Sequence, residues 1–158
     1  MADIEQLKAR IREEVEASRQ RQTEFTQQLI RQRDRLTTLL EQIIDWVDAL
    51  NIDPLEITRR SLTQTVERFG EPHSITLSAL EISFGACKLH VKPEEQYLTG
   101  HRTLMYSTAD EEDVKEILHA EHNYYYADLQ FGQKRHLSQY SPLIAENFYK
   151  LLFAWLRV

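Results

Sequence analysis

Residues 25–50 read FTQQLIRQRDRLTTLLEQIIDWVDAL, and their apolar side chains recur at the spacing of an α-helix. The same seven-residue register extends back to Ile4, and the chain has no proline or glycine before Pro54. One helix over residues 1–50 is therefore predicted. At a rise of about 1.5 Å per residue it would be roughly 70 Å long, more than a small domain can cover. Its apolar face consists of Ile4, Ile11, Val15, Phe25, Leu29, Leu36, Leu39, Ile43, Trp46 and Leu50.

The apolar face of this helix changes character near residue 36. Before that point, Gln22 and Gln32 occupy core positions of the repeat, and polar residues there weaken a coiled coil while they fix its register. From Leu36 onward the apolar face widens, as expected for a helix packed on a globular core. We therefore expect residues 36–50 to belong to the core and residues 1–35 to project from it or to pair with a partner.

Arginines gather beside the apolar face. Residues 17–35 hold five of them against Glu24 and Asp34, a local charge of +3 in a chain of net charge −6. Three interpretations stay open: solvated side chains along the helix, contact with an acidic helix of another protein, or contact with a nucleic-acid backbone, which the acidic chain disfavours. The residues expected to contact a partner are Ile4, Ile11, Val15, Phe25, Leu29, Arg19, Arg21, Arg33 and Arg35.

Residues 51–158 are predicted to form a small α+β domain. A helix can begin at Asp53 and Pro54 and end at Gly70, with Leu55, Leu62, Val66 and Phe69 on its inner face. Alternating apolar residues predict strands over 75–84 and 88–92, and a third strand is expected over 101–107. A capping box that starts at Thr108 then predicts a helix to about Glu121.

The remaining residues are predicted to contain two strands and a final helix. Tyr124 to Phe131 has the pattern of a strand, Gly132-Gln133 that of a turn, and residues 135–140 that of a returning strand. A helix is expected to open at Ser141-Pro142. The order after the long helix is then α-β-β-β-α-β-β-α, which favours an antiparallel sheet with helices packed on it.

This order of elements, in an acidic chain, resembles that of type III secretion chaperones. The resemblance covers residues 53–158, rests on element order with no sequence motif, and does not include the long N-terminal helix. It implies a protein that dimerises and wraps an unfolded segment of another protein. Immunity-type and adaptor proteins would have the same appearance at this level.

Few side chains suggest chemistry. His119 and His122 stand three residues apart on the predicted helix, and His101 could complete a zinc site; solvated histidines near a helix end are the favoured alternative. Tyr124 and Tyr126 would share one face of a strand and could contact a peptide or ligand, although packing within the sheet explains them as well. No cofactor is expected.

Composition narrows the class of protein. The net charge of −6 disfavours nucleic acid and anionic membranes as main partners. The single cysteine, Cys87, cannot form an intrachain disulfide. The first residues, MADIEQ, do not resemble a secretory signal, and the longest apolar run, residues 151–156, is too short to cross a bilayer, so a cytoplasmic location is expected.

We therefore expect a non-enzymatic interaction protein that acts as an adaptor or scaffold. Its helix over residues 1–35 would form a homo-oligomer, in the simplest case a dimer, or dock on a helical and possibly acidic partner. A secretion-chaperone-like or immunity-type binding protein is one alternative. A small metal-dependent enzyme or ligand-binding protein that uses His101, His119 and His122 is the other.

Overall fold

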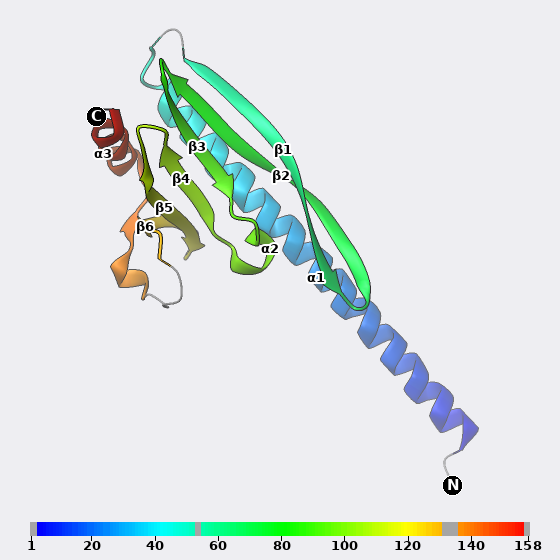
Figure 1. The fold of residues 1–158 in the computed structure, drawn as a ribbon. Coiled ribbons are helices and arrows are strands. Elements are labelled where there is room, and N and C mark those ends of the chain that lie inside the picture. Colours follow the sequence, from blue (N-terminus) through cyan, green and yellow to red (C-terminus); the bar gives the residue numbers. More distant parts are fainter. Residues whose placement is uncertain (1–2, 53–54, 131–135, 157–158) are drawn as a thin grey trace.

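The computed structural model describes residues 3–52, 55–130 and 136–156. A long helix, α1 (Ile4–Asp48), runs along one face of an antiparallel sheet and extends well beyond it (Figure 1). The C-terminal helix, α3 (Ala145–Leu156), lies beside the far end of α1. The predicted α+β class, with a long N-terminal helix, is confirmed.

The described residues form seven strands, which follow one another across the sheet in chain order, each antiparallel to the next. A short helix, α2 (Tyr97–Gly100), and a 3-10 turn, η1 (Leu137–Gln139), lie in the connections. The strands are β1 (Glu56–Arg68), β2 (Glu71–Phe84), β3 (Cys87–Pro93), β4 (Thr103–Ser107), β5 (Asp110–Ala120), β6 (Asn123–Asp128) and β7 (Ser141–Pro142).

The C-terminal half of α1 forms the spine of the hydrophobic core. Its buried face meets apolar side chains from β2 to β5, and α3 closes the end of the core through Phe148, Leu152 and Trp155. The hydroxyl of Tyr149 in α3 also donates to the carbonyl oxygen of Trp46 in α1 at 2.6 Å. The buried residues of α1 are Leu29, Leu36, Leu39, Leu40, Ile43 and Val47.

The helix predicted between Asp53 and Gly70 is wrong, because Glu56–Arg68 is β1. Its predicted start at Asp53 and Pro54 lies outside the described residues. The register of β1 with β2 is unbroken, yet Ile57 and Leu62, five residues apart and hence on opposite faces of a strand, both pack against the core. A two-stranded ribbon can do this by twisting until its other face meets the helix, and Figure 1 shows β1 and β2 winding about each other. Because of this twist, the residues of β1 that face the core do not simply alternate along the strand. Their spacing resembles that of the apolar residues on one face of a helix.

The helix predicted from Thr108 to Glu121 is also wrong, because Asp110–Ala120 is β5. This strand pairs with β4 on one side and with β6 on the other. The hydroxyl of Thr108 does not cap a helix but accepts the backbone N–H of Lys88 at 2.8 Å, in the turn between β4 and β5. Pairing on both edges outweighs the local helix signal, as tertiary context commonly does.

The end of the chain differs from the prediction as well. In the described part of the predicted returning strand, residues 136–140, the chain forms η1 and no strand. Residue 135 and the predicted turn at Gly132-Gln133 lie outside the described residues. Ser141 and Pro142 form the short edge strand β7, where a proline is tolerated because one side of the strand needs no donor; α3 begins only at Ala145. The element order that resembled type III secretion chaperones is therefore not the observed order.

Candidate functional site

The first part of α1 projects beyond the sheet and exposes large apolar side chains (Figure 1). Ile4, Leu7, Ile11 and Val15 are each between 49% and 68% exposed. Ile11 stands five helical turns, at about 3.6 residues per turn, before the buried Leu29, so both lie on the same line along the helix. We call residues 4–22 the stalk and these four side chains its seam. The seam is a direct continuation of the row that packs on the sheet.

The seam ends where the tip of the β1–β2 hairpin meets α1. The ring of Phe25 packs edge-on against Phe69 and His73, with centroids 5.9 and 5.2 Å apart, and the guanidinium of Arg68 lies 5.4 Å from the Phe25 ring centre. Leu29 is only 5% exposed. Phe25 and Leu29, which were expected to contact a partner, therefore contact the protein's own hairpin. The covered part of α1 begins earlier than residue 36 because this hairpin is unusually long.

The turn at the hairpin tip is formed by Phe69 and Gly70, both with positive φ (56° and 73°). Two such residues make the type I′ turn whose twist matches that of paired strands. The glycine that was expected to end a helix instead closes this hairpin. Its position fixes how far along α1 the sheet reaches.

The four arginines that were expected to contact a partner do not form one patch. Arg21 bonds to Glu14 at 3.2 Å and Arg33 to the neighbouring Asp34 at 3.2 Å, each within its own stretch of helix. Arg19 is exposed on the stalk, whereas Arg35 is level with the sheet, where its carbonyl oxygen accepts the hydroxyl of a β6 tyrosine at 2.6 Å. Only Arg19 and Arg21 accompany the exposed seam.

Two histidines and two tyrosines meet where α1 crosses the sheet. His101, His119, Tyr97 and Tyr124 line a space of about 10 Å³ against α1, room for about one water. The ring of His119 packs on that of Tyr124, with centroids 5.1 Å apart. His122 lies in the turn between β5 and β6, with φ of 67°, and does not line this space. The cluster leaves no cavity for a substrate.

The polar atoms of this cluster hold α1 to the sheet. The Tyr97 hydroxyl donates to the carbonyl oxygen of Gln32 at 2.7 Å, and the Tyr124 hydroxyl donates to that of Arg35. The Gln32 side chain meets His101 at 2.7 Å. Burial raises the pKa of Tyr97 and of Tyr124, so both hydroxyls stay protonated and donating. Within the described residues, no group of three or more histidine, cysteine or acidic side chains is arranged to hold a metal ion.

Replacing His119 with glutamine is expected to reduce the acid sensitivity of the fold. Burial, with smaller effects of Arg35 and His122, lowers the pKa of His119 below its ordinary value of 6.5. The unfolded chain therefore takes up this proton at a higher pH than the folded chain does, so the free energy of unfolding falls as the pH drops below about 6.5. Urea unfolding at about pH 7.5 and about pH 5.5 should show a smaller loss for H119Q than for the wild type. An equal loss in both would contradict this.

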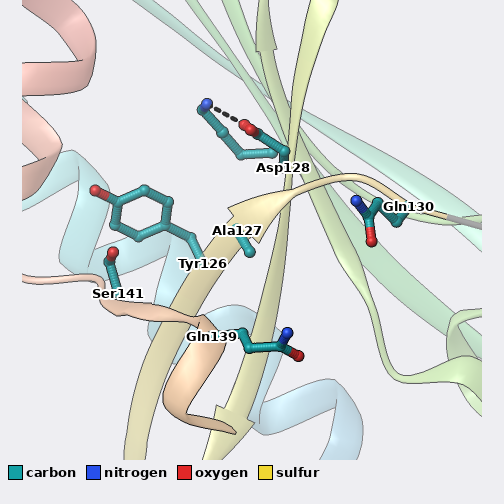
Figure 2. A pocket seen from close by; sticks show the side chains of 7 residues that line it. Tyr126, Ala127, Asp128, Gln130, Gln139 and Ser141 are labelled. Atoms are coloured by element: carbon teal, nitrogen blue, oxygen red, sulfur yellow. Dashed lines mark hydrogen bonds and ion pairs between the residues drawn. The ribbon is translucent and has the colours of Figure 1, made fainter. Parts of the chain in front are cut away.

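A polar pocket lies at the end of β6 (Figure 2). Tyr126 and Ser141 lie side by side in its lining. Ala127, Gln130, Gln139 and the ion pair between Lys115 and Asp128 line the rest. Burial alone would lower the pKa of Lys115, but hydrogen bonds to Asp128 and Asp113 raise it. Lys115 thus stays a charged ammonium group and is no nucleophile near neutral pH. Tyr126 is half-buried, packs against the core and lines this pocket beside the charged Lys115.

Comparison of the chain with models of known protein families, with curated proteins and with solved structures found no match. None of the helices in the described part of the chain is long and apolar enough to cross a membrane. Function must therefore be inferred from the geometry of the molecule itself. Its most distinctive surface is the seam of the stalk. Of the four seam residues, Leu7 was not predicted, because it lies outside the two core positions of the heptad repeat.

Proposed function

We propose that this protein is a non-enzymatic interaction protein, an adaptor or scaffold that docks on another helix through the seam of its stalk. The observation that carries the proposal is the continuity of one helical face, buried from Leu29 to Val47 and exposed from Ile4 to Val15. Clustered exposed apolar side chains on a soluble protein usually mark a docking surface. A helix is the fitting partner, because a narrow stripe with three- and four-residue spacing accepts another amphipathic helix.

The strength of such a contact can be bounded. Each seam residue is about half exposed or more, so burying it contributes about 1 kcal/mol, and a partner helix of the same kind contributes a similar amount. Association costs about 4 kcal/mol or more in lost freedom of motion. The balance is about 4 kcal/mol at most, so the complex is weak, with a dissociation constant in the millimolar range. A cytoplasmic location belongs to this proposal and is supported by the single, half-buried Cys87, since cytosolic proteins seldom depend on disulfides.

The seam is tested by making it polar. The variant I4Q/I11Q/V15Q is expected to lose association, with a helical content in circular dichroism close to that of the wild type, because these side chains have no contacts in the core. A matched control, A9Q/E13Q/E16Q, carries three glutamines on the opposite face of the same turns and should associate as the wild type does. Sedimentation and capture of helical partners from native lysate supply the measurements. Equal behaviour of both variants would refute a docking role of the seam.

A further inference from the structure

We propose that the helix which covers the seam is the stalk of a second copy of this chain, and that the two stalks pair antiparallel. In this pairing Ile11 of each copy lies next to Val15 of the other. The inference rests on the proposed function and adds to it the identity of the partner and the orientation of the pair. Four observations support it: the place of the hairpin, the continuity of α1, the polar layers of the repeat and the charges beside the seam.

The hairpin excludes a parallel pair. From Phe25 onward, β1 and β2 cover the seam side of α1 (Figure 1). They occupy the position that a second helix would need there. Two packed helices lie about 8–10 Å apart, and α1 is a single helix from Ile4 to Asp48 with no break at which it could turn away. In a parallel pair, residues 25–48 of each copy would run into the hairpin of the other. In an antiparallel pair the two sheet domains lie at opposite ends.

The hairpin also sets the register of the antiparallel pair. With Ile11 next to Val15 of the other copy, the stalks overlap over residues 4–22, and each hairpin tip stops level with the N-terminal end of the opposite α1. A register one heptad longer would press each hairpin against the other stalk near Lys8. A register one heptad shorter would set Ile11 against Lys8 in place of Val15. The proposed register is the longest overlap that the hairpins permit.

The polar residues of the repeat favour the same arrangement. Lys8 and Ser18 also occupy core positions of the seven-residue repeat, one heptad before Val15 and one after Ile11. A parallel pair would place the two Lys8 ammonium groups side by side in one core layer, which is repulsive. The antiparallel register places Lys8 beside Ser18 and Ile4 beside Gln22, so that no layer contains two like charges. These polar layers lie at the ends of the stalk, and the layers at its centre, formed by Ile11 and Val15, are entirely apolar.

Charges beside the seam are compatible with this pairing. Glu5 and Arg19 flank the seam at equivalent positions of the repeat and face each other across an antiparallel pair. Two pairs of like charge, Glu14 with Glu14 and Arg12 with Arg12, come near each other at the centre. Each Glu14 is already bonded to Arg21 of its own chain at 3.2 Å, and the two Arg12 side chains lie on the other edge of the seam. In a parallel pair Arg19 would face Glu14 instead. The partner of Arg19 therefore reports the orientation.

The test is disulfide trapping in the full chain, with the native thiol removed by C87S. Two proteins are made, one with I11C and one with V15C, and each is oxidised alone and in a mixture of the two. In the antiparallel pair residue 11 neighbours only residue 15, so the mixture is expected to form linked dimers at least about tenfold faster than either protein alone. A pair of E13C proteins, with the thiol on the opposite face, serves as the control that should stay unlinked.

The outcomes separate this inference from the proposed function. Rapid linkage of I11C with itself would show a parallel pair and overturn the inference. No linkage in any sample, together with a monomeric wild type at about 1 mM in sedimentation, would overturn the second copy as partner. In that case a helical partner lost on I4Q/I11Q/V15Q substitution would still support the docking role of the seam, whereas the absence of any such partner would refute both.

Discussion

Replacing Arg102 with alanine is expected to lower the free energy of unfolding by about 3 kcal/mol or more. The guanidinium of Arg102 lies between two shielded carboxylates, 2.9 Å from Glu94 and 3.0 Å from Glu116, and the Glu116 side chain is only 4% exposed. Removal of the arginine leaves both carboxylates shielded from water without this cation. Urea unfolding at neutral pH, with R102A and the wild type side by side, measures the loss.

Arg60 provides the matched control for this prediction. It forms an ion pair with Glu81 at 3.3 Å on the open face of the sheet, with its side chain 67% exposed. Glu81 is 12% exposed, but it keeps Lys88 at 3.1 Å when Arg60 is removed, and the exposed Arg60 contributes about 0–1 kcal/mol, so R60A should be close to the wild type. A loss for R60A as large as that for R102A would show that the loss does not come from leaving shielded carboxylates without a nearby cation.

Arg102, Glu94 and Glu116 form a cluster, which we call the Arg102 cluster. It also holds the described residues on either side of the gap in the loop after β6. The Tyr140 hydroxyl donates to Glu116 at 2.6 Å, and Arg102 donates to the carbonyl oxygen of Gln130 at 3.2 Å. Hydrogen bonds to Glu94, and then to Glu116, raise the pKa of Arg102 above its usual range. The guanidinium therefore holds residues from three separate parts of the chain while it stays fully charged, and Glu116 links Tyr140 to them.

The sequence was sufficient to predict α1 because its signal is local and repeated. The predicted span of residues 1–50 contains the observed Ile4–Asp48, and Asp3 caps the start of the helix by accepting the N–H of Glu5 at 3.4 Å. The point at which the sheet begins to cover the helix was not predictable in the same way. It depends on the length of a hairpin that starts more than thirty residues beyond Phe25 in the chain.

The two wrong helices, over β1 and β5, share a cause. Each segment has apolar residues at helical spacing, but each is held by pairing with strands that local patterns do not reveal. In β1 the threonines Thr58, Thr63 and Thr65 were a usable strand signal, because β-branched residues favour extended backbone. In β5 the alternation is hidden because Glu116 is buried on the face opposite Ile117, in the Arg102 cluster.

For the candidate site, the sequence identified most of the seam but could not show which residues were free to form it. Ile4, Ile11 and Val15 are exposed as expected, whereas Phe25 and Leu29 belong to the same repeat and are covered by the hairpin. The histidines were placed on a helix that does not exist. Their meeting with the tyrosines follows from strand register, which pairs His119 with Tyr124.

Replacing Ile43 with alanine is expected to destabilise the fold by about 2–5 kcal/mol, because its side chain is fully buried in the core and its loss leaves a cavity. The same substitution at Ile11, on the same face of the same helix, should change the stability of an isolated chain by no more than about 0.5 kcal/mol, since alanine is also the better helix former. Urea unfolding of I43A and I11A at several protein concentrations measures both effects.

The concentration dependence distinguishes the two roles of α1. The loss in I43A belongs to the single chain and should be the same at every protein concentration. Any loss in I11A should grow with concentration, because association stabilises the folded wild type by mass action and the variant lacks that contribution. A large, concentration-independent loss in I11A would mean that the stalk contributes to the core. The proposal of an exposed docking helix would then be wrong, because the seam would already have its partner within the chain.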